Sequence, residues 1–138
     1  MKFYIGITDT NWYNYISRIN PEDLNFWKPG ENSSFKVLSP GEPFLFKLKS
    51  PYNAISGMGF FTCFSKLPIN IAWDTFGNRN GCENFTEFKA LISKYRFNSN
   101  FFVDNSLIGC VILTNPIFFK SEDWIEIPEN WSKSIVQG

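Results

Sequence analysis

Apolar residues alternate with polar or small ones along several short segments of the chain, and this two-residue period predicts β-strands. The longest segment contains Gly57 and Gly59, which indicate a bulge or a close approach of another backbone. The turn Pro40-Gly41 precedes one of the shorter strands. The expected strands cover residues 2–8, 35–38, 44–49, 55–65, 108–113 with an extension through 117–119, and a last edge strand at 124–127.

Three helices are expected between these strands. The first covers residues 9–19, where polar residues can cap its start. The second covers residues 69–76 and has a proline at its first turn. The third, residues 84–95, is amphipathic, and Asn84 followed by Glu87 provides its capping signal. The segments expected to be loops are residues 22–34 and 77–81.

Five or six short strands and three helices in mixed order predict an α+β, barrel-like domain. A chain of 138 residues is long enough for one domain with its own core. We expect this domain to span residues 1–129. Residues 130–138 are expected to be a C-terminal tail that links to another part of a longer protein.

Aromatic residues make up 19 % of the chain, more than a core of this size usually needs. Some rings are therefore expected near the surface, where rings serve stacking, interfaces or no function. Lys and Arg number 13 against 13 Asp and Glu, so the formal net charge is +0. We therefore do not expect electrostatic contacts to phosphates to dominate binding. A nucleic-acid binder of this composition needs a pocket that supplies much of its affinity.

The chain contains no histidine, which removes the usual general base and zinc ligand. A nuclease of the His-Asn-His type cannot be built from it, and we expect no catalytic residue, metal or cofactor. The three cysteines are widely spaced, and Cys63 and Cys110 are expected to be small buried residues in a reducing cytoplasm. No apolar run approaches the ~20 residues of a membrane-spanning helix.

The ordered strings "PGEPFLFKLK", "ISGMGFF", "IGCVILTNPIFF" and "EDWIEIP", with Ala72-Trp73 on the helix between them, resemble the PUA-like superfamily of ASCH, EVE, YTH and SRA domains. More closely, the chain resembles the N-terminal reader domain of HNH-family restriction endonucleases that attack modified DNA. The resemblance covers nearly the whole chain. It implies a PUA-like mixed β-barrel of five to six strands with flanking helices, and makes residues 130–138 the linker to a nuclease domain.

The resemblance also implies a mechanism, in which a modified base is flipped out of duplex DNA into an aromatic pocket. Unstacking costs a few kcal/mol and is offset by stacking, at about 1–3 kcal/mol per base. The expected partner is double-stranded DNA with 5-methyl- or 5-hydroxymethylcytosine first and N6-methyladenine second. The resemblance allows a dimer formed through the nuclease domain. An RNA-binding module that reads a modified base, or a small-molecule or protein-interaction domain, are the alternatives.

Two tryptophans are the implied cage walls. Trp27 lies in the polar loop before Pro29-Gly30, and Trp73 lies on the helix after the glycine-containing strand. Alternatively, Trp27 could simply cover the core, and Trp73 could pack its helix against the barrel. Asp74 could accept a hydrogen bond from an exocyclic amine, as carboxylates do with cytosine N4, or could simply be solvated.

The remaining candidates are polar groups beside these rings and dispersed cations. The base-binding set is completed by Asp9, Thr10 and Asn11, which could instead cap the first helix, by Asn25, which could belong to a turn, and by Trp12, which could pack in the core. Candidates for phosphate contact are Lys47, Lys49, Arg79, Lys94 and Arg96. Arg79 is favoured among them because its Gly-Asn-Arg-Asn-Gly loop could place it in a groove. The alternative for each cation is a solvated charged surface.

Overall fold

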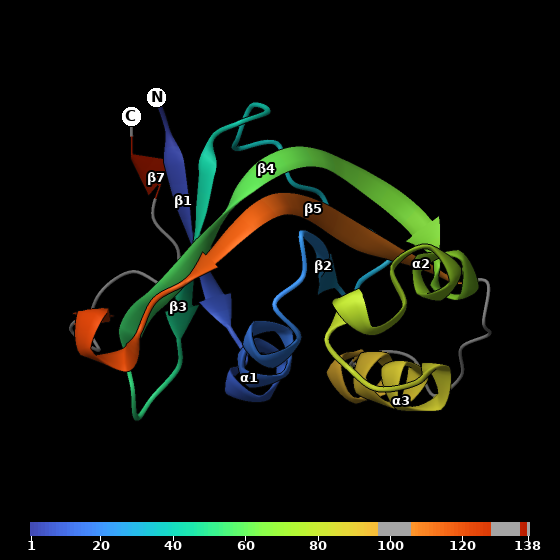
Figure 1. Cartoon of the computed structure of the whole chain (residues 1–138). Coiled ribbons are helices and arrows are strands. Elements are labelled where there is room, and N and C mark those ends of the chain that lie inside the picture. The colour runs from blue at the N-terminus through green and yellow to red at the C-terminus, as the bar shows by residue number, and fades with distance from the viewer. Residues whose placement is uncertain (97–105, 128–135, 138) are drawn as a thin grey trace.

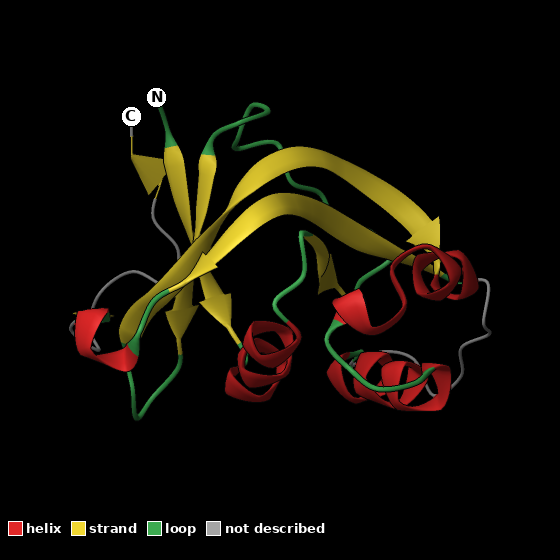
Figure 2. Cartoon of the chain, in the orientation of Figure 1, coloured by secondary structure: helices red, strands yellow, loops and turns green. Residues whose placement is uncertain are grey.

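The computed structural model describes residues 1–96, 106–127 and 136–137, which form one bent mixed sheet with helices beneath it (Figures 1 and 2). The strand order is β2-β5-β4-β3-β1-β7, with β6 paired to β4 beside this path. In the described chain no pairing joins the two ends of this order, β2 and β7. The strands are β1 Phe3–Thr8, β2 Asp23–Lys28, β3 Pro43–Leu48, β4 Ala54–Pro68, β5 Leu107–Phe118, β6 Ile125–Glu126 and β7 Val136–Gln137.

The helices lie on the inner side of the bend, where β4 and β5 arch from the β1–β3 region over to α2 (Figure 1). The α-helices are α1 Thr10–Ile19, α2 Ile69–Phe76 and α3 Phe85–Tyr95, and the 3₁₀ turns are η1 Gly77–Asn80 and η2 Ser121–Asp123. Asp9 caps α1 by accepting from the backbone N–H of Trp12, and Asn84 caps α3 by accepting from that of Glu87. These caps explain why both helices begin where the sequence predicts.

The long antiparallel pair β4–β5 holds the two parts of the molecule together. Its register shifts between Met58 and Phe60 and again between Phe61 and Cys63, and such bulges bend a strand. The close backbone approach expected at Gly57 is present, because a Cβ there would lie 2.5 Å from the carbonyl oxygen of Ile117. β1 and β3 are parallel, whereas the other strand pairs are antiparallel.

Two main clusters of buried residues fill the space between the sheet and the helices. The larger joins one face of α1 to β2, β3 and β5, and its fully buried members include Ile16, Phe46 and Leu113. The smaller joins α2 and α3 to the far end of β5, through residues such as Phe88 and Ile108. Most of the stabilisation of α1 and α3 comes from burying these apolar faces, since helices of this length are marginal alone.

The α+β fold with a mixed sheet is confirmed, and all three helices lie where the sequence predicts them. Two predictions about local structure are wrong. Residues 22–34 contain the strand β2, which pairs with β5 along its whole length. Residues 35–38 are not a strand, although Phe35 and Leu38 are buried, because their side chains pack in the core without any strand pairing of their backbone.

The tail expected at residues 130–138 falls largely outside the described residues. Val136 and Gln137 are described, and they pair with Tyr4 and Phe3 of β1. The assignment of residues 130–138 to a linker stays a prediction.

Candidate functional site

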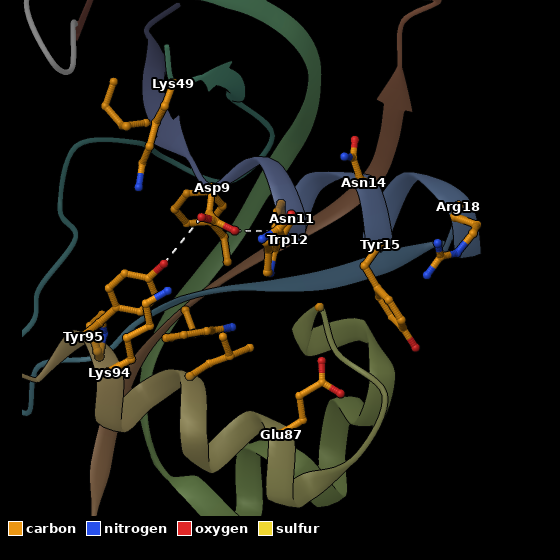
Figure 3. Close-up of a pocket in the computed structure, with 16 residues that line it drawn as sticks. Asp9, Asn11, Trp12, Asn14, Tyr15, Arg18, Lys49, Glu87, Lys94 and Tyr95 are labelled. Carbon is orange, nitrogen blue, oxygen red and sulfur yellow. Dashed lines mark hydrogen bonds between the residues drawn. The ribbon is translucent and has the colours of Figure 1, made fainter. Parts of the chain in front are cut away.

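A cavity of about 530 Å³ opens between α1 and α3, next to the ends of β1 and β2 (Figure 3). Apart from Asp9, its partly buried members are aromatic or aliphatic, whereas Asn11, Asn14, Arg18, Glu87 and Lys94 of α1 and α3 are exposed. The lining elements belong to both core clusters, α1 to the larger and α3 to the smaller, so the cavity exists only in the folded chain. The lining residues are Ile7, Asp9, Asn11, Trp12, Asn14, Tyr15, Arg18, Phe26, Trp27, Pro29, Lys49, Gly81, Glu87, Leu91, Lys94 and Tyr95.

The indole rings of Trp12 and Trp27 are fixed by a single acceptor. Both indole N–H groups donate to the backbone oxygen of Asn80, at 3.0 Å from Trp12 and 2.8 Å from Trp27. Each of these N–H groups already has its partner within the protein. Both rings line the cavity without offering it a hydrogen-bond donor. Trp12 is only 9 % exposed and packs in the larger core cluster, so Trp27 presents most of the ring surface.

Asn80 is held in place by its own buried side chain. Its Nδ2 donates to the backbone oxygens of Ala72 and Gly77, at 3.1 and 2.9 Å, and its Oδ1 accepts from Asn25 Nδ2 at 2.8 Å. The next residue, Gly81, has a φ of +97°, and a Cβ there would lie 2.1 Å from the ring of Trp12. The turn that carries the shared acceptor therefore depends on a glycine.

Asp9 places a carboxylate at the cavity while it caps α1. Its Oδ2 accepts from the backbone N–H of Trp12 at 3.0 Å, and its Oδ1 accepts from the hydroxyl of Tyr95 at 3.4 Å (Figure 3). Burial raises the pKa of Tyr95, and the charge and hydrogen bond of Asp9 raise it further. At neutral pH the phenol is therefore protonated and can remain a donor to Asp9.

Charged side chains lie at both ends of the cavity. Figure 3 shows Lys49 and Lys94 near Asp9 and Tyr95, whereas Arg18 lies at the opposite end. Arg18 lies over the ring of Tyr15, with its guanidinium carbon 5.2 Å from the ring centroid. The Nζ of Lys94 lies 5.5 Å from the ring centroid of Tyr95. Since Asp9 and Glu87 also line the cavity, its charges nearly cancel.

The structure brings several predicted residues together at this cavity. They are Asp9, Asn11, Trp12, Trp27, Lys49 and Lys94. Thr10 is adjacent to them in the first turn of α1 but is not a lining residue. Sequence reasoning missed Tyr95 and Arg18. Tyr95 falls on the apolar face of the amphipathic helix expected at residues 84–95, and nothing in the local sequence shows that this face ends at an opening.

Three predicted base-binding residues lie away from the cavity. Trp73 stacks on Phe85 with ring centroids 6.3 Å apart, and it packs against the smaller core cluster. Asp74 is exposed on α2. Asn25 is completely buried, and its Nδ2 donates to Asn80 and to the sulfur of Cys110. A base-binding role for these residues stays a prediction to which the cavity lends no support.

Three of the five predicted phosphate contacts are either buried or bonded within the protein. Lys47 is only 6 % exposed. Arg79 forms an ion pair with Asp23 and donates to two backbone oxygens at the end of α2. Arg96 donates to the backbone oxygen of Pro29 at 2.7 Å. Lys49 and Lys94 are the predicted cations that line the cavity.

Cys110 is buried as expected, but the expectation for Cys63 is wrong. Cys63 is exposed because the bulge after Phe61 changes the direction of its side chain. Burial raises the pKa of Cys110 to about 11 and that of Cys82 to about 12, so both are neutral thiols at neutral pH. No cluster of three or more cysteine or acidic side chains in the described residues could hold a metal ion. Likewise, no described helix is long and apolar enough to cross a membrane.

Searches against protein families and curated proteins find no match, but solved structures of an ASCH protein from Zymomonas mobilis are similar. A Tyr→Phe variant of that protein has a TM-score of 0.61 and 9 % identity, over 96 % of this chain and 86 % of that one. The crystal structure titled as ASCH from the same organism has a TM-score of 0.60 and 10 % identity, over 95 % and 82 %. Identity this low shows the fold alone. The structural neighbours are thus ASCH domains of the PUA-like superfamily, and the closer resemblance to an endonuclease reader domain stays a prediction.

Proposed function

We propose that this chain, whose fold is that of an ASCH domain, binds nucleic acid by taking one unstacked nucleobase into the cavity between α1 and α3. The observation that carries the proposal is the partly exposed ring of Trp27, which lines the cavity and is fixed on the oxygen of Asn80 beside the largely buried ring of Trp12. Rings held in this way need no reordering when a flat ligand stacks on them, so little entropy is lost on binding. Base–aromatic stacking supplies about 1–3 kcal/mol per base.

The size of the cavity supports this ligand class. A volume of about 530 Å³ lies within the usual range for small-molecule sites, which are mostly apolar with a few polar groups. Here the aromatic walls are accompanied by Asp9 and Tyr95 inside and by Lys49 and Lys94 at one end. This arrangement suits a base stacked on Trp27 with its phosphate near the lysines.

The charge of the site favours a base that is already unpaired. Asp9 and Glu87 offset most of the positive charge of Lys49, Lys94 and Arg18, so the electrostatic attraction of the site for phosphates is weak. Extruding a base costs least when the strand is single or the base is mismatched or damaged. We therefore place single-stranded nucleic acid ahead of an intact duplex.

The narrower form of the proposal is a reader of modified DNA that targets a restriction endonuclease. It rests on the sequence resemblance, and it requires the protein to extract 5-methyl- or 5-hydroxymethylcytosine, or N6-methyladenine, from a duplex. An added methyl group that packs against the aromatic residues of the cavity would strengthen binding through its buried area, by about 25 cal/mol per Å². An RNA strand offers the same base edges and stacking faces, and the experiment below includes it.

The proposal is tested by equilibrium titration that follows tryptophan fluorescence. The ligands are matched single strands of DNA and RNA, and duplexes with cytosine, 5-methylcytosine, 5-hydroxymethylcytosine, adenine or N6-methyladenine at one position. We expect saturable binding of a single strand, accompanied by quenching because a base stacks on Trp27. A preference of about tenfold for one modified duplex, or about 1.4 kcal/mol, would support the narrower form.

Two variants locate the binding site. Trp27→Leu removes a ring that lines the cavity, and Trp73→Leu removes a ring of the same kind that packs outside it. We expect Trp27→Leu to weaken binding about tenfold or more, and Trp73→Leu to keep it within about twofold. Equal effects of the two substitutions, in folded proteins, or no binding of any strand by the wild type, would contradict the proposal.

A further inference from the structure

Hydrogen-bond selectivity in the cavity has to come from groups other than the tryptophans. Both indole N–H groups are bonded to Asn80, so these walls can recognise only the face of a ring. Stacking tolerates every base, because every base has a π-face. Any discrimination between bases therefore depends on the remaining polar groups that line the cavity.

Asp9 is distinguished among those groups by burial and by chemistry. It is partly buried, whereas Glu87, the other carboxylate among the described lining residues, is exposed. The asparagines and tyrosines of the lining can both donate and accept, so they do not favour one polarity. An ionised carboxylate only accepts, and it accepts through about four lone-pair positions.

The acceptor capacity of Asp9 is only partly used within the protein. One oxygen accepts from the backbone N–H of Trp12 at 3.0 Å, and the other accepts from the Tyr95 hydroxyl at 3.4 Å. Each oxygen retains a lone pair for another donor. The cap fixes the carboxylate, because rotating it away would leave the first turn of α1 without its partner.

We infer that Asp9 selects a base that carries an exocyclic amino group, by accepting a hydrogen bond from that group inside the cavity. This inference rests on the proposed function and narrows its ligand to bases such as cytosine and adenine. A carboxylate is the side chain that accepts from the N4 amine of cytosine in known recognition. A base without a donor at that place leaves Asp9 desolvated and unpaired, which is unfavourable.

The same chemistry was expected of Asp74 from the sequence. Asp74 is exposed on α2 and does not line the cavity, so it provides a matched control for the same chemical change. Asp9→Asn keeps a good helix cap, because Asn and Asp are equivalent at that position. Its amide oxygen can serve the Trp12 N–H, which leaves an NH₂ group, a donor, where the carboxylate faced the ligand.

The test uses four single-stranded DNA probes that differ only in one central base flanked by thymidines. The bases are cytosine, 2-pyrimidinone, adenine and purine, so each pair differs by one amino group alone. For the wild type and for Asp74→Asn, we expect loss of the amine to weaken binding about tenfold, or about 1.4 kcal/mol. For Asp9→Asn, we expect an effect of less than about twofold, or a reversed preference.

The outcomes separate this inference from the proposed function. Tight binding of all four probes by the wild type, without amine dependence, would overturn the inference and leave the base-binding proposal standing. An amine effect that is the same in Asp9→Asn, or that disappears in Asp74→Asn, would also overturn it. Binding of none of these probes, and of none of the RNA strands in the titration above, would overturn the proposed function together with the inference.

A second variant covers the case in which Asp9→Asn does not fold. Tyr95→Phe removes the hydroxyl that donates to Asp9 and leaves the carboxylate in place. We expect the amine preference to persist or to grow in Tyr95→Phe, since a lone pair is released. Loss of the preference there would assign selectivity to the phenol instead.

Discussion

Gly81 combines a backbone conformation that favours glycine with close contact to a ring of the candidate site. Its φ of +97° is unfavourable for any side chain, and a Cβ would lie 2.1 Å from Cδ1 of Trp12. The same turn carries the Asn80 oxygen that both tryptophans use. A change at Gly81 therefore affects folding and the cavity together.

We predict that Gly81→Ala is considerably more destabilising than Gly41→Ala. Gly41 also has a positive φ, +91°, but a Cβ there meets nothing within 4 Å, so its substitution measures backbone strain alone. That strain is about 1–2 kcal/mol. The crowding against Trp12 adds a further ~1–3 kcal/mol. Urea unfolding of both variants gives the difference, and equal losses would mean that the ring moves aside freely.

Part of the candidate site could be predicted residue by residue. Asp9 and Trp12 follow the first strand, so their local sequence places them at the end of an element, where sites form. Trp27 was expected near the site from the polar loop before Pro29-Gly30, although it lies in β2. That Arg79 and Arg96 bond to the protein itself could not be predicted. Their acceptors include the carboxylate of Asp23, 56 residues before Arg79, and the backbone oxygen of Pro29, 67 residues before Arg96, and no local pattern marks these as partners.

At the scale of elements, the helices were predictable because their signals are local. The caps Asp9 and Asn84 act within three residues of themselves. β2 was not predictable, because its sequence Asp-Leu-Asn-Phe-Trp-Lys places Asn25 in a buried position. The Nδ2 of that residue finds its acceptor in Asn80, 55 residues later, which no local pattern reveals.

The turn before β3 is tied to the start of β1 by one side chain. Glu42 accepts from the backbone N–H of Ser39 at 2.7 Å and from that of Lys2 at 2.8 Å. These bonds, with Ser39 the larger contribution, hold the pKa of Glu42 below its ordinary value of 4.5. A lowered pKa in the folded state means that the stabilisation is present above 4.5 and is lost as the pH falls through the lowered value.

We therefore predict that Glu42→Gln removes part of the acid sensitivity of the fold. Gln cannot titrate, so its hydrogen bonds do not change between neutral and acidic solution. Urea midpoints measured at neutral pH and below pH ~4 should fall less in Glu42→Gln than in the wild type. An identical fall in both proteins would show that Glu42 does not contribute to the pH dependence of stability.

At the scale of the whole molecule, the cavity lies where the two core clusters meet. Trp12 belongs to the larger cluster, Trp27 packs against the smaller one, and both are bonded to Asn80. The arch of β4 and β5 spans both clusters (Figure 1). The shape of the cavity thus depends on the whole fold. For this reason local sequence patterns alone could not predict which residues line it.

The overall charge is consistent with the same account. A formal charge of +0 provides little long-range attraction for phosphates, so binding has to depend on contacts inside the cavity. The central claim is therefore spatial: a nucleobase lies against the rings between α1 and α3.

Photochemical cross-linking tests that claim most directly. A single-stranded probe with one 5-iodocytosine, which keeps the exocyclic amine and couples to nearby aromatic rings on irradiation, is bound to the intact chain, and the modified residue is identified by mass spectrometry. We predict coupling to rings that line the cavity, with Trp27 and Tyr95 foremost because they are partly exposed. Coupling confined to rings outside it, such as Trp73, Trp124 or Tyr52, would contradict the account.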